Sequence, residues 1–80
     1  MDQFNNKLNA IIYSNRALTL MKDKKFEEAL QDCNKSIELD ENYFKSYLRR
    51  GKIREELEDF DAAIFDYKKV QELDSSKINN

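Results

Sequence analysis

Apolar residues recur along this chain at intervals of three and four positions, which is the spacing of a helix with one buried face. The pattern is clear at Tyr13, Ala17, Leu20 and Met21, and the polar run Lys22–Lys25 interrupts it. Similar stripes and interruptions follow along the rest of the chain. The expected helices are about Lys7–Lys22, Phe26–Leu39, Phe44–Leu57 and Phe60–Leu73, and the expected links after each pair are Asp40–Asn42 and Asp74–Ser76.

The chain also repeats itself with a period of 34 residues, a length typical of stacked helical hairpins. A shift of 34 aligns nine identical pairs without a gap: Tyr13/Tyr47, Arg16/Arg50, Phe26/Phe60, Ala29/Ala63, Asp32/Asp66, Lys35/Lys69, Glu38/Glu72, Leu39/Leu73 and Asp40/Asp74. We therefore divide the chain into two repeats, residues 10–43 and 44–77. Residues 1–9 are expected to be a linker or the remnant of a preceding repeat with the start of the first helix, and residues 78–80 a tail.

Small residues stand at corresponding places in the two copies, where paired helices have to approach closely. They are Ala17 and Gly51 in the first helix of each copy, and Ala29 and Ala63 in the second. Because Gly inside a helix costs about 1 kcal/mol relative to Ala, we expect Gly51 to have a packing reason. The residues expected in the core are Tyr13, Tyr47, Phe26, Phe60 and Cys33. The fold class is therefore expected to be all-α, an array of about four antiparallel helices.

Composition narrows the chemistry that this chain can perform. With 80 residues it forms one small domain, and the absence of Pro and the single Gly favour helix. The absence of His excludes imidazole as a base or a metal ligand, and one Cys excludes an internal disulfide, which suits the cytoplasm. No nucleotide-binding loop, calcium loop or nucleic-acid motif is present, and apolar runs are too short for a membrane span. We expect no catalytic residue, cofactor, metal, nucleic acid or membrane partner.

Charge is divided unevenly between the expected helices. The first helix of each copy carries +3, whereas the second helices carry −4 and −2, within a chain of net charge −2. In stacked hairpins the first helices would line one surface, so this surface could form a basic groove for an anionic ligand. The alternative is that these charges only form solvated faces, and the sign of the charge does not decide between the two.

Three donors within these helices are placed to meet. Lys45 and Arg49 are four residues apart and project from one helical face, and Asn15 occupies the repeat position of Arg49. If the repeats stack in register, an amide, an ammonium and a guanidinium group would lie together. Such a cluster suits carboxylates.

The repeated pattern Tyr13…Ala17…Leu20…Phe26-x-x-Ala29…Leu39-Asp40 resembles the tetratricopeptide repeat (TPR) family. The resemblance covers nearly the whole chain and implies an alpha-alpha superhelix of helical hairpins. The chain departs from the family pattern at four positions: the closing Pro is Glu41 in one copy and Ser75 in the other, Arg54 replaces an aromatic residue, and Ala17 replaces a preferred Gly.

The stretches Tyr13–Ala17 and Lys45–Gly51 further resemble the carboxylate-clamp type of TPR. This resemblance implies binding of chaperone tails that end in Glu-Glu-Val-Asp, from the cytosolic heat-shock chaperones of the seventy- and ninety-kilodalton classes. It implies that Asn15 holds the terminal carboxylate, and that Lys45 and Arg49 hold the last Asp side chain and nearby backbone oxygens. The runs Ala29–Cys33 and Asp66–Val70 are most similar to the TPR region of J-domain (DnaJ-type) co-chaperones.

Two further expectations follow from the boundaries of the repeats. A full clamp uses three repeats, so we expect a partial clamp that binds its peptide weakly. Two repeats also leave apolar edges, which favour self-association or a helix-swapped dimer. The alternative function is a general TPR scaffold that assembles a multiprotein complex without recognising carboxylates.

Overall fold

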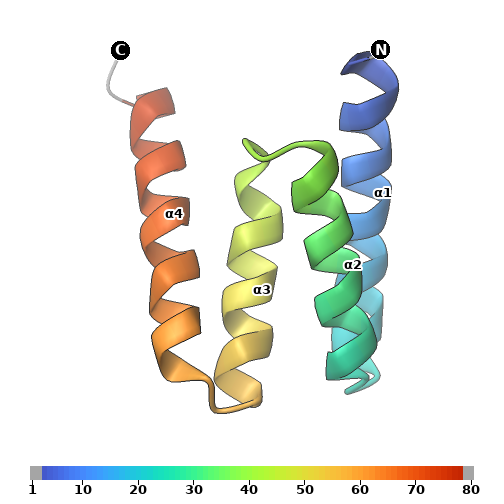
Figure 1. The fold of residues 1–80 in the computed structure, drawn as a ribbon, viewed down its shortest axis with the longest axis vertical. Coiled ribbons are helices and arrows are strands. Elements are labelled where there is room, and N and C mark those ends of the chain that lie inside the picture. Colours follow the sequence, from blue (N-terminus) through green and yellow to red (C-terminus); the bar gives the residue numbers. More distant parts are fainter. Residues whose placement is uncertain (1–2, 79–80) are drawn as a thin grey trace.

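The computed structural model describes the backbone of residues 3–78 and the side chains of residues 3–74. The described backbone forms four helices: α1 (Gln3–Lys22), α2 (Phe26–Leu39), α3 (Phe44–Glu56) and α4 (Phe60–Ile78). Successive helices run antiparallel, with α2 beside α1 at one side of the molecule and α4 at the other (Figure 1). The predicted all-α array of helical hairpins is confirmed. None of the helices in the described part of the chain is both long and apolar enough to cross a membrane.

Three helix ends differ from the prediction: α3 ends one residue early, at Glu56 instead of Leu57, and the other two differences are larger. Helix α1 begins at Gln3 instead of Lys7, and α4 continues to Ile78, so the segment 74–76 is helical and is not a link. Neither extension contains a Gly or a Pro that would stop a helix. The polar composition of these segments was therefore a poor guide to where the helices end.

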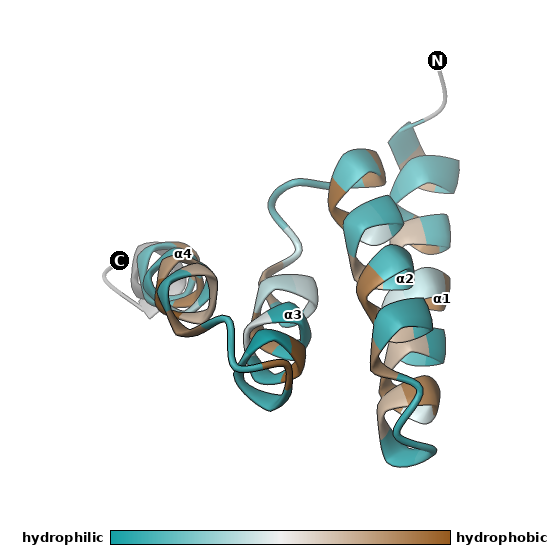
Figure 2. Cartoon of the chain, turned by 60° about the horizontal axis from the view of Figure 1, so that its bottom comes forward, coloured by the Kyte–Doolittle hydropathy of each residue, from teal (hydrophilic) through white to brown (hydrophobic). Residues whose placement is uncertain are grey.

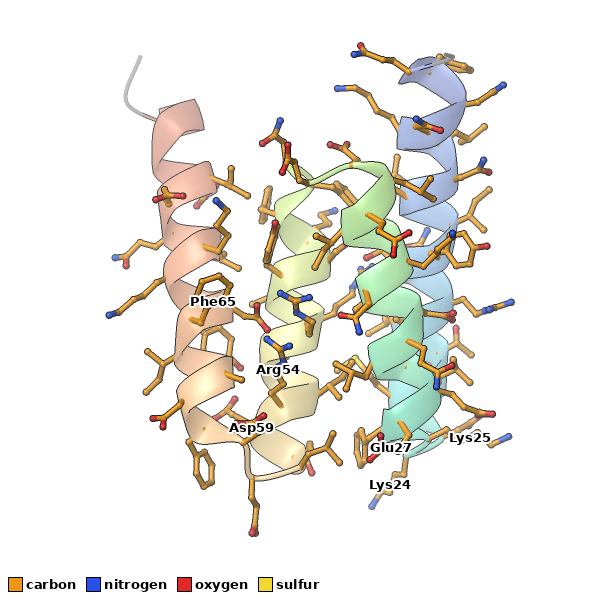
Figure 3. All side chains as sticks on the ribbon, in the orientation of Figure 1. Lys24, Lys25, Glu27, Arg54, Asp59 and Phe65 are labelled. Atoms are coloured by element: carbon orange, nitrogen blue, oxygen red, sulfur yellow. The ribbon has the colours of Figure 1, made fainter. Side chains whose placement is uncertain are left out.

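The two hairpin turns share one backbone geometry. Lys24 and Glu58, which are 34 residues apart, have positive φ angles of 61° and 63°. After α1, the Lys25 amide donates to the Leu20 carbonyl at 2.8 Å, and the same bond recurs after α3. This is a Schellman ending, in which a left-handed residue closes the helix. Lys24 and Lys25 lie at one hairpin tip and Asp59 at the other, at the same end of the molecule (Figure 3).

Helix α2 packs between α1 and α3 and carries much of the core. Ala17, Ala29, Cys33 and Ile53 are fully buried in one cluster. Each helix combines hydrophobic and hydrophilic positions (Figure 2), so only part of its surface needs to be covered. The small residues of this cluster allow three helix backbones to approach closely.

Gly51 has the packing reason that the sequence suggested. A Cβ atom at this position would lie 2.8 Å from Cε1 of Tyr67, which is closer than carbon atoms pack. Tyr67 is held in place by a hydrogen bond from its hydroxyl to Glu55. The corresponding residues of the first repeat are Ala17 and Cys33. The second repeat therefore combines a smaller residue on its first helix (Gly51) with a larger one on its second helix (Tyr67).

Large apolar side chains remain exposed on the two outer helices. They are Phe4, Leu8, Ile11 and Ile12 on α1, and Phe60, Ile64 and Phe65 on α4. The assignment of Phe60 to the core was therefore wrong: it is 57% exposed. Its counterpart Phe26 packs against the core beside α3, and no helix in the described chain covers α4 in the same way. Self-association through these edges stays a prediction.

Candidate functional site

A chain of buried hydroxyl groups joins the three helices that surround the candidate site. Ser36 on α2 donates to the Ala10 carbonyl on α1 at 2.6 Å, and its Oγ lies 2.5 Å from that of Ser46 on α3. Because the single Ser36 proton points to Ala10, Ser46 must be the donor to Ser36. All three positions are fully buried. These bonds fix how α3 lies relative to α1, next to the segment that carries Lys45 and Arg49.

Arg49 reaches from α3 to α1 and contacts two neighbouring residues there. Its Nη1 donates to Ser14 Oγ at 2.7 Å and to Asn15 Oδ1 at 3.2 Å. Ser14 is fully buried, Arg49 is half-buried and Asn15 is exposed. The contact therefore forms at the boundary between the core and the solvent. The structure brings Asn15 and Arg49 together directly, across 34 residues of sequence.

Lys45 lies one helical turn before Arg49 on α3, which corresponds to about 5.4 Å along the helix axis. Its side chain is exposed, and no ion pair involving it is found among residues 3–74. Unlike Asn15 and Arg49, it makes no hydrogen bond to either of the other two predicted site residues within that range. Lys45 therefore adds an unpaired ammonium group near the Asn15–Arg49 contact.

Three arginines of the first helices form ion pairs with the second helices. Arg16 pairs with Asp32 at 2.7 Å, and Arg50 pairs with Asp66 at 2.8 Å. Arg54, labelled on α3 in Figure 3, also pairs with the fully buried Asp66, at 2.9 Å. These pairs neutralise only part of the expected charge separation, since Arg50 and Arg54 share the single carboxylate of Asp66. Lys45 and Arg49 are among the cations of α1 and α3 for which no ion pair is found among residues 3–74.

Ion pairs and ring contacts explain three of the identities in the 34-residue repeat: Tyr13/Tyr47, Arg16/Arg50 and Asp32/Asp66. Arg16 also lies over the ring of Tyr13, with 5.6 Å to the ring centre, and Arg50 lies over Tyr47 at 5.5 Å. Each repeat thus contains the same Tyr–Arg–Asp arrangement between its two helices. These residues hold each hairpin together, and Asn15, Lys45 and Arg49 are not part of this arrangement.

Family comparison assigns both halves of the chain to one class of repeat. Models of the tetratricopeptide repeat match residues 10–43 and residues 44–77. The chain belongs to the tetratricopeptide repeat family. TPR domains are protein-interaction modules, and the resemblance noted from the sequence is confirmed.

Related proteins narrow the type of TPR. The chain is 38% identical over 77 residues to DnaJ homolog subfamily C member 7 from Mus musculus, covering 96% of this chain and 16% of that protein. The second TPR of Spaghetti (RPAP3), solved with the HSP90 peptide SRMEEVD, is 40% identical with a TM-score of 0.79, over 81% of this chain and 56% of that one. The TPR2B domain of yeast Sti1, in complex with an Hsp70 peptide, is 34% identical with a TM-score of 0.84, over 89% and 57%. The predicted similarity to TPR co-chaperones, including the J-domain type, is confirmed.

A hollow continues from the site along the same two helices of the TPR array. Its volume is about 540 Å³, and it lies toward the hairpin tips. Leu18, Met21 and Phe26 supply apolar lining. The charged lining has both signs: Lys22, Lys24, Lys52, Glu55 and Glu56. Leu18 follows Asn15 by three positions, as Lys52 follows Arg49, so the hollow and the donor cluster share a face of each helix. An extended chain could contact both.

Sequence reasoning missed the hydrogen bonds that the three buried serines make. Ser14, Ser46 and Ser36 correspond to Leu48, Ile12 and Val70 in the other repeat, so each places a hydroxyl where its counterpart is apolar. A polar residue at a core position needs a hydrogen-bond partner. The replacement of an apolar residue by Ser at a core position was therefore the sequence feature that could have identified Ser14 as a hydrogen-bond partner of Arg49.

The site can bind an anion, and its surroundings offer little for other chemistry. Lys45 and Arg49 donate hydrogen bonds only, and Asn15 contributes an amide. No cluster of acidic or Cys side chains suited to a metal ion occurs among the described residues. Burial raises the pKa of the Cys33 thiol to about 12, which leaves it protonated and unreactive at neutral pH.

Proposed function

We propose that this TPR chain is a binding module of a co-chaperone, and that it recognises the acidic C-terminal tail of cytosolic heat-shock chaperones. Asn15, Lys45 and Arg49 form its carboxylate-binding residues. The observation that carries the proposal is the direct contact of Arg49 with Asn15 between the two repeats, which gathers an amide and a guanidinium at one exposed place. Related TPR structures contain bound HSP90 and Hsp70 peptides, which supports this ligand class.

The chemistry of the cluster matches such a tail. A chain that ends in Asp presents two carboxylates close together, and charge-assisted hydrogen bonds to them form in a fixed geometry. The chain acts by binding and not by catalysis in this proposal. It works in the cytosol, where the single unpaired Cys33 stays reduced.

Titration calorimetry with the peptide SRMEEVD tests this function. We expect the free acid to bind about tenfold or more tightly than the C-terminal amide, because one lost charge-assisted bond is worth about 1.5–3 kcal/mol. Lys45→Ala and Arg49→Ala should each weaken binding without unfolding the protein. Lys68→Ala is the matched control, since Lys68 is an exposed cation on α4.

Equal affinity for the acid and the amide would rule out carboxylate recognition. If Lys45→Ala and Arg49→Ala leave the peptide affinity unchanged, these two residues do not recognise the carboxylates. Either result would favour the alternative, a scaffold that binds its partners through another surface.

A further inference from the structure

Arg49 is held by α1 in a way that uses one end of its guanidinium group. Nη1 carries two hydrogens, and the bonds to Ser14 and Asn15 use both. No partner for Nε or Nη2 is found among residues 3–74. These two nitrogens form the edge of the guanidinium that binds a carboxylate with two parallel hydrogen bonds. The α1 contacts therefore leave the bidentate edge for a ligand.

The same contact determines how the Asn15 amide is turned. Arg49 can only donate hydrogen bonds, so the atom that faces it must be the Asn15 oxygen. The NH₂ end of the amide then points away from Arg49, and its two hydrogens remain for a second anionic oxygen. An isolated surface Asn would present either end. Here one orientation is selected before any ligand arrives.

Ser14 is the most firmly placed member of this group. It is fully buried, lies on α1 within the packed part of the array, and accepts the shorter of the two bonds from Arg49, at 2.7 Å against 3.2 Å. Asn15 is exposed and would not by itself hold a long side chain against solvent. The order of Arg49 thus depends on the Ser14 hydroxyl.

We propose that Ser14 is a positioning residue of the carboxylate site: its hydroxyl anchors Arg49, and Arg49 in turn orients the Asn15 amide toward the ligand. This inference rests on the proposed function and adds a residue to it. An Arg side chain that is ordered before binding loses less conformational freedom when the ligand arrives, which raises affinity. Ser14 contributes to binding although it need not touch the peptide.

A double-mutant cycle separates this role from a purely structural one. Ser14→Ala should weaken binding of the free-acid SRMEEVD peptide about three- to tenfold, which is less than the loss of a direct charge-assisted bond to the peptide, because Ser14 acts only through Arg49. In an Arg49→Ala background the same substitution should have no further effect on affinity. A loss of equal size in both backgrounds, or no loss in either, would overturn the proposal.

NMR spectroscopy of the unliganded wild-type protein provides a test that does not depend on the folding of a variant. An anchored Arg49 should give separate, slowly averaging Nη hydrogen signals, which an Arg49→Lys variant identifies by their loss. A single averaged signal would show a freely rotating guanidinium and overturn the inference.

The amide orientation has its own test. Asn15→Asp keeps the shape and an acceptor for Arg49, but replaces the outward NH₂ with a negative oxygen. It should bind the peptide more weakly than Asn15→Ala, and equal or tighter binding would contradict the orientation. The proposed function is judged separately, by the preference of the wild-type protein for the free acid over the amide. If that preference holds while Ser14→Ala is silent, only the inference about Ser14 fails.

Discussion

The contact between Gly51 and Tyr67 predicts a stability coupling that can be measured. Replacing Gly51 with Ala should gain about 1 kcal/mol from helix propensity. The added Cβ would lie 2.8 Å from the Tyr67 ring, and such overpacking costs about 1–3 kcal/mol. The expected net result is a loss of up to about 2 kcal/mol in the free energy of unfolding, obtained by combining these two effects.

The effect should reverse when the ring is removed. In a Tyr67→Cys background, Gly51→Ala should stabilise the protein by about 1 kcal/mol, and the double variant has the Ala–Cys pair found in the first repeat. Urea unfolding followed by circular dichroism at 222 nm, under reducing conditions, measures all four members of the cycle. The loss of the Tyr67 bond to Glu55 occurs in both variants that lack the ring and cancels in the comparison.

Ala17→Gly provides the matched control in the first repeat. It should destabilise the protein by about 1 kcal/mol or more, from propensity and lost packing, whether or not Tyr67 is present. If Gly51→Ala instead changes stability by the same amount in both backgrounds, the ring does not determine the residue at position 51. The packing explanation of Gly51 would then be wrong.

Three further outcomes are expected from the structure. Lys24→Gly and Glu58→Gly should each raise the free energy of unfolding in urea by up to about 1 kcal/mol, since Gly adopts a positive φ without strain; a loss of stability would contradict the turn geometry. Asp66→Asn should lower the free energy of unfolding by about 3 kcal/mol or more, because it breaks a buried ion-pair cluster. Asp32→Asn should lower it by less, because the Arg partner of Asp32 is 64% exposed. Equal losses of stability in urea unfolding would refute this difference. The Cys33 thiol should react with iodoacetamide at pH 8 only when urea unfolds the protein, and fast alkylation of the folded protein would show that the thiol is not buried. Because the pKa of Cys33 is raised in the folded protein, its contribution to the free energy of unfolding should be complete below pH 9 and should be lost as the pH rises toward 12.

The helices, the way they pair and the family could all be predicted from the amino-acid sequence alone. Apolar spacing and the 34-residue period depend on residues that are close in sequence or related by the repeat, so they can be read without coordinates. The same information placed Asn15 and Arg49 at equivalent positions of neighbouring repeats, and it suggested that Gly51 had a packing role. It placed the ends of α1 and α4 incorrectly, because polar residues without Gly or Pro do not stop a helix.

Which side chains contact one another, and which stay exposed, depends on how the helices pack in space. Phe26 and Phe60 are identical in the repeat, but α3 lies beside the first, and the second is 57% exposed. Ser14 became a partner of Arg49 only once α3 packed against α1, since the two residues are 35 positions apart. A repeat predicts the surroundings that its copies share, whereas burial and hydrogen bonding depend on the neighbour that each copy has in space.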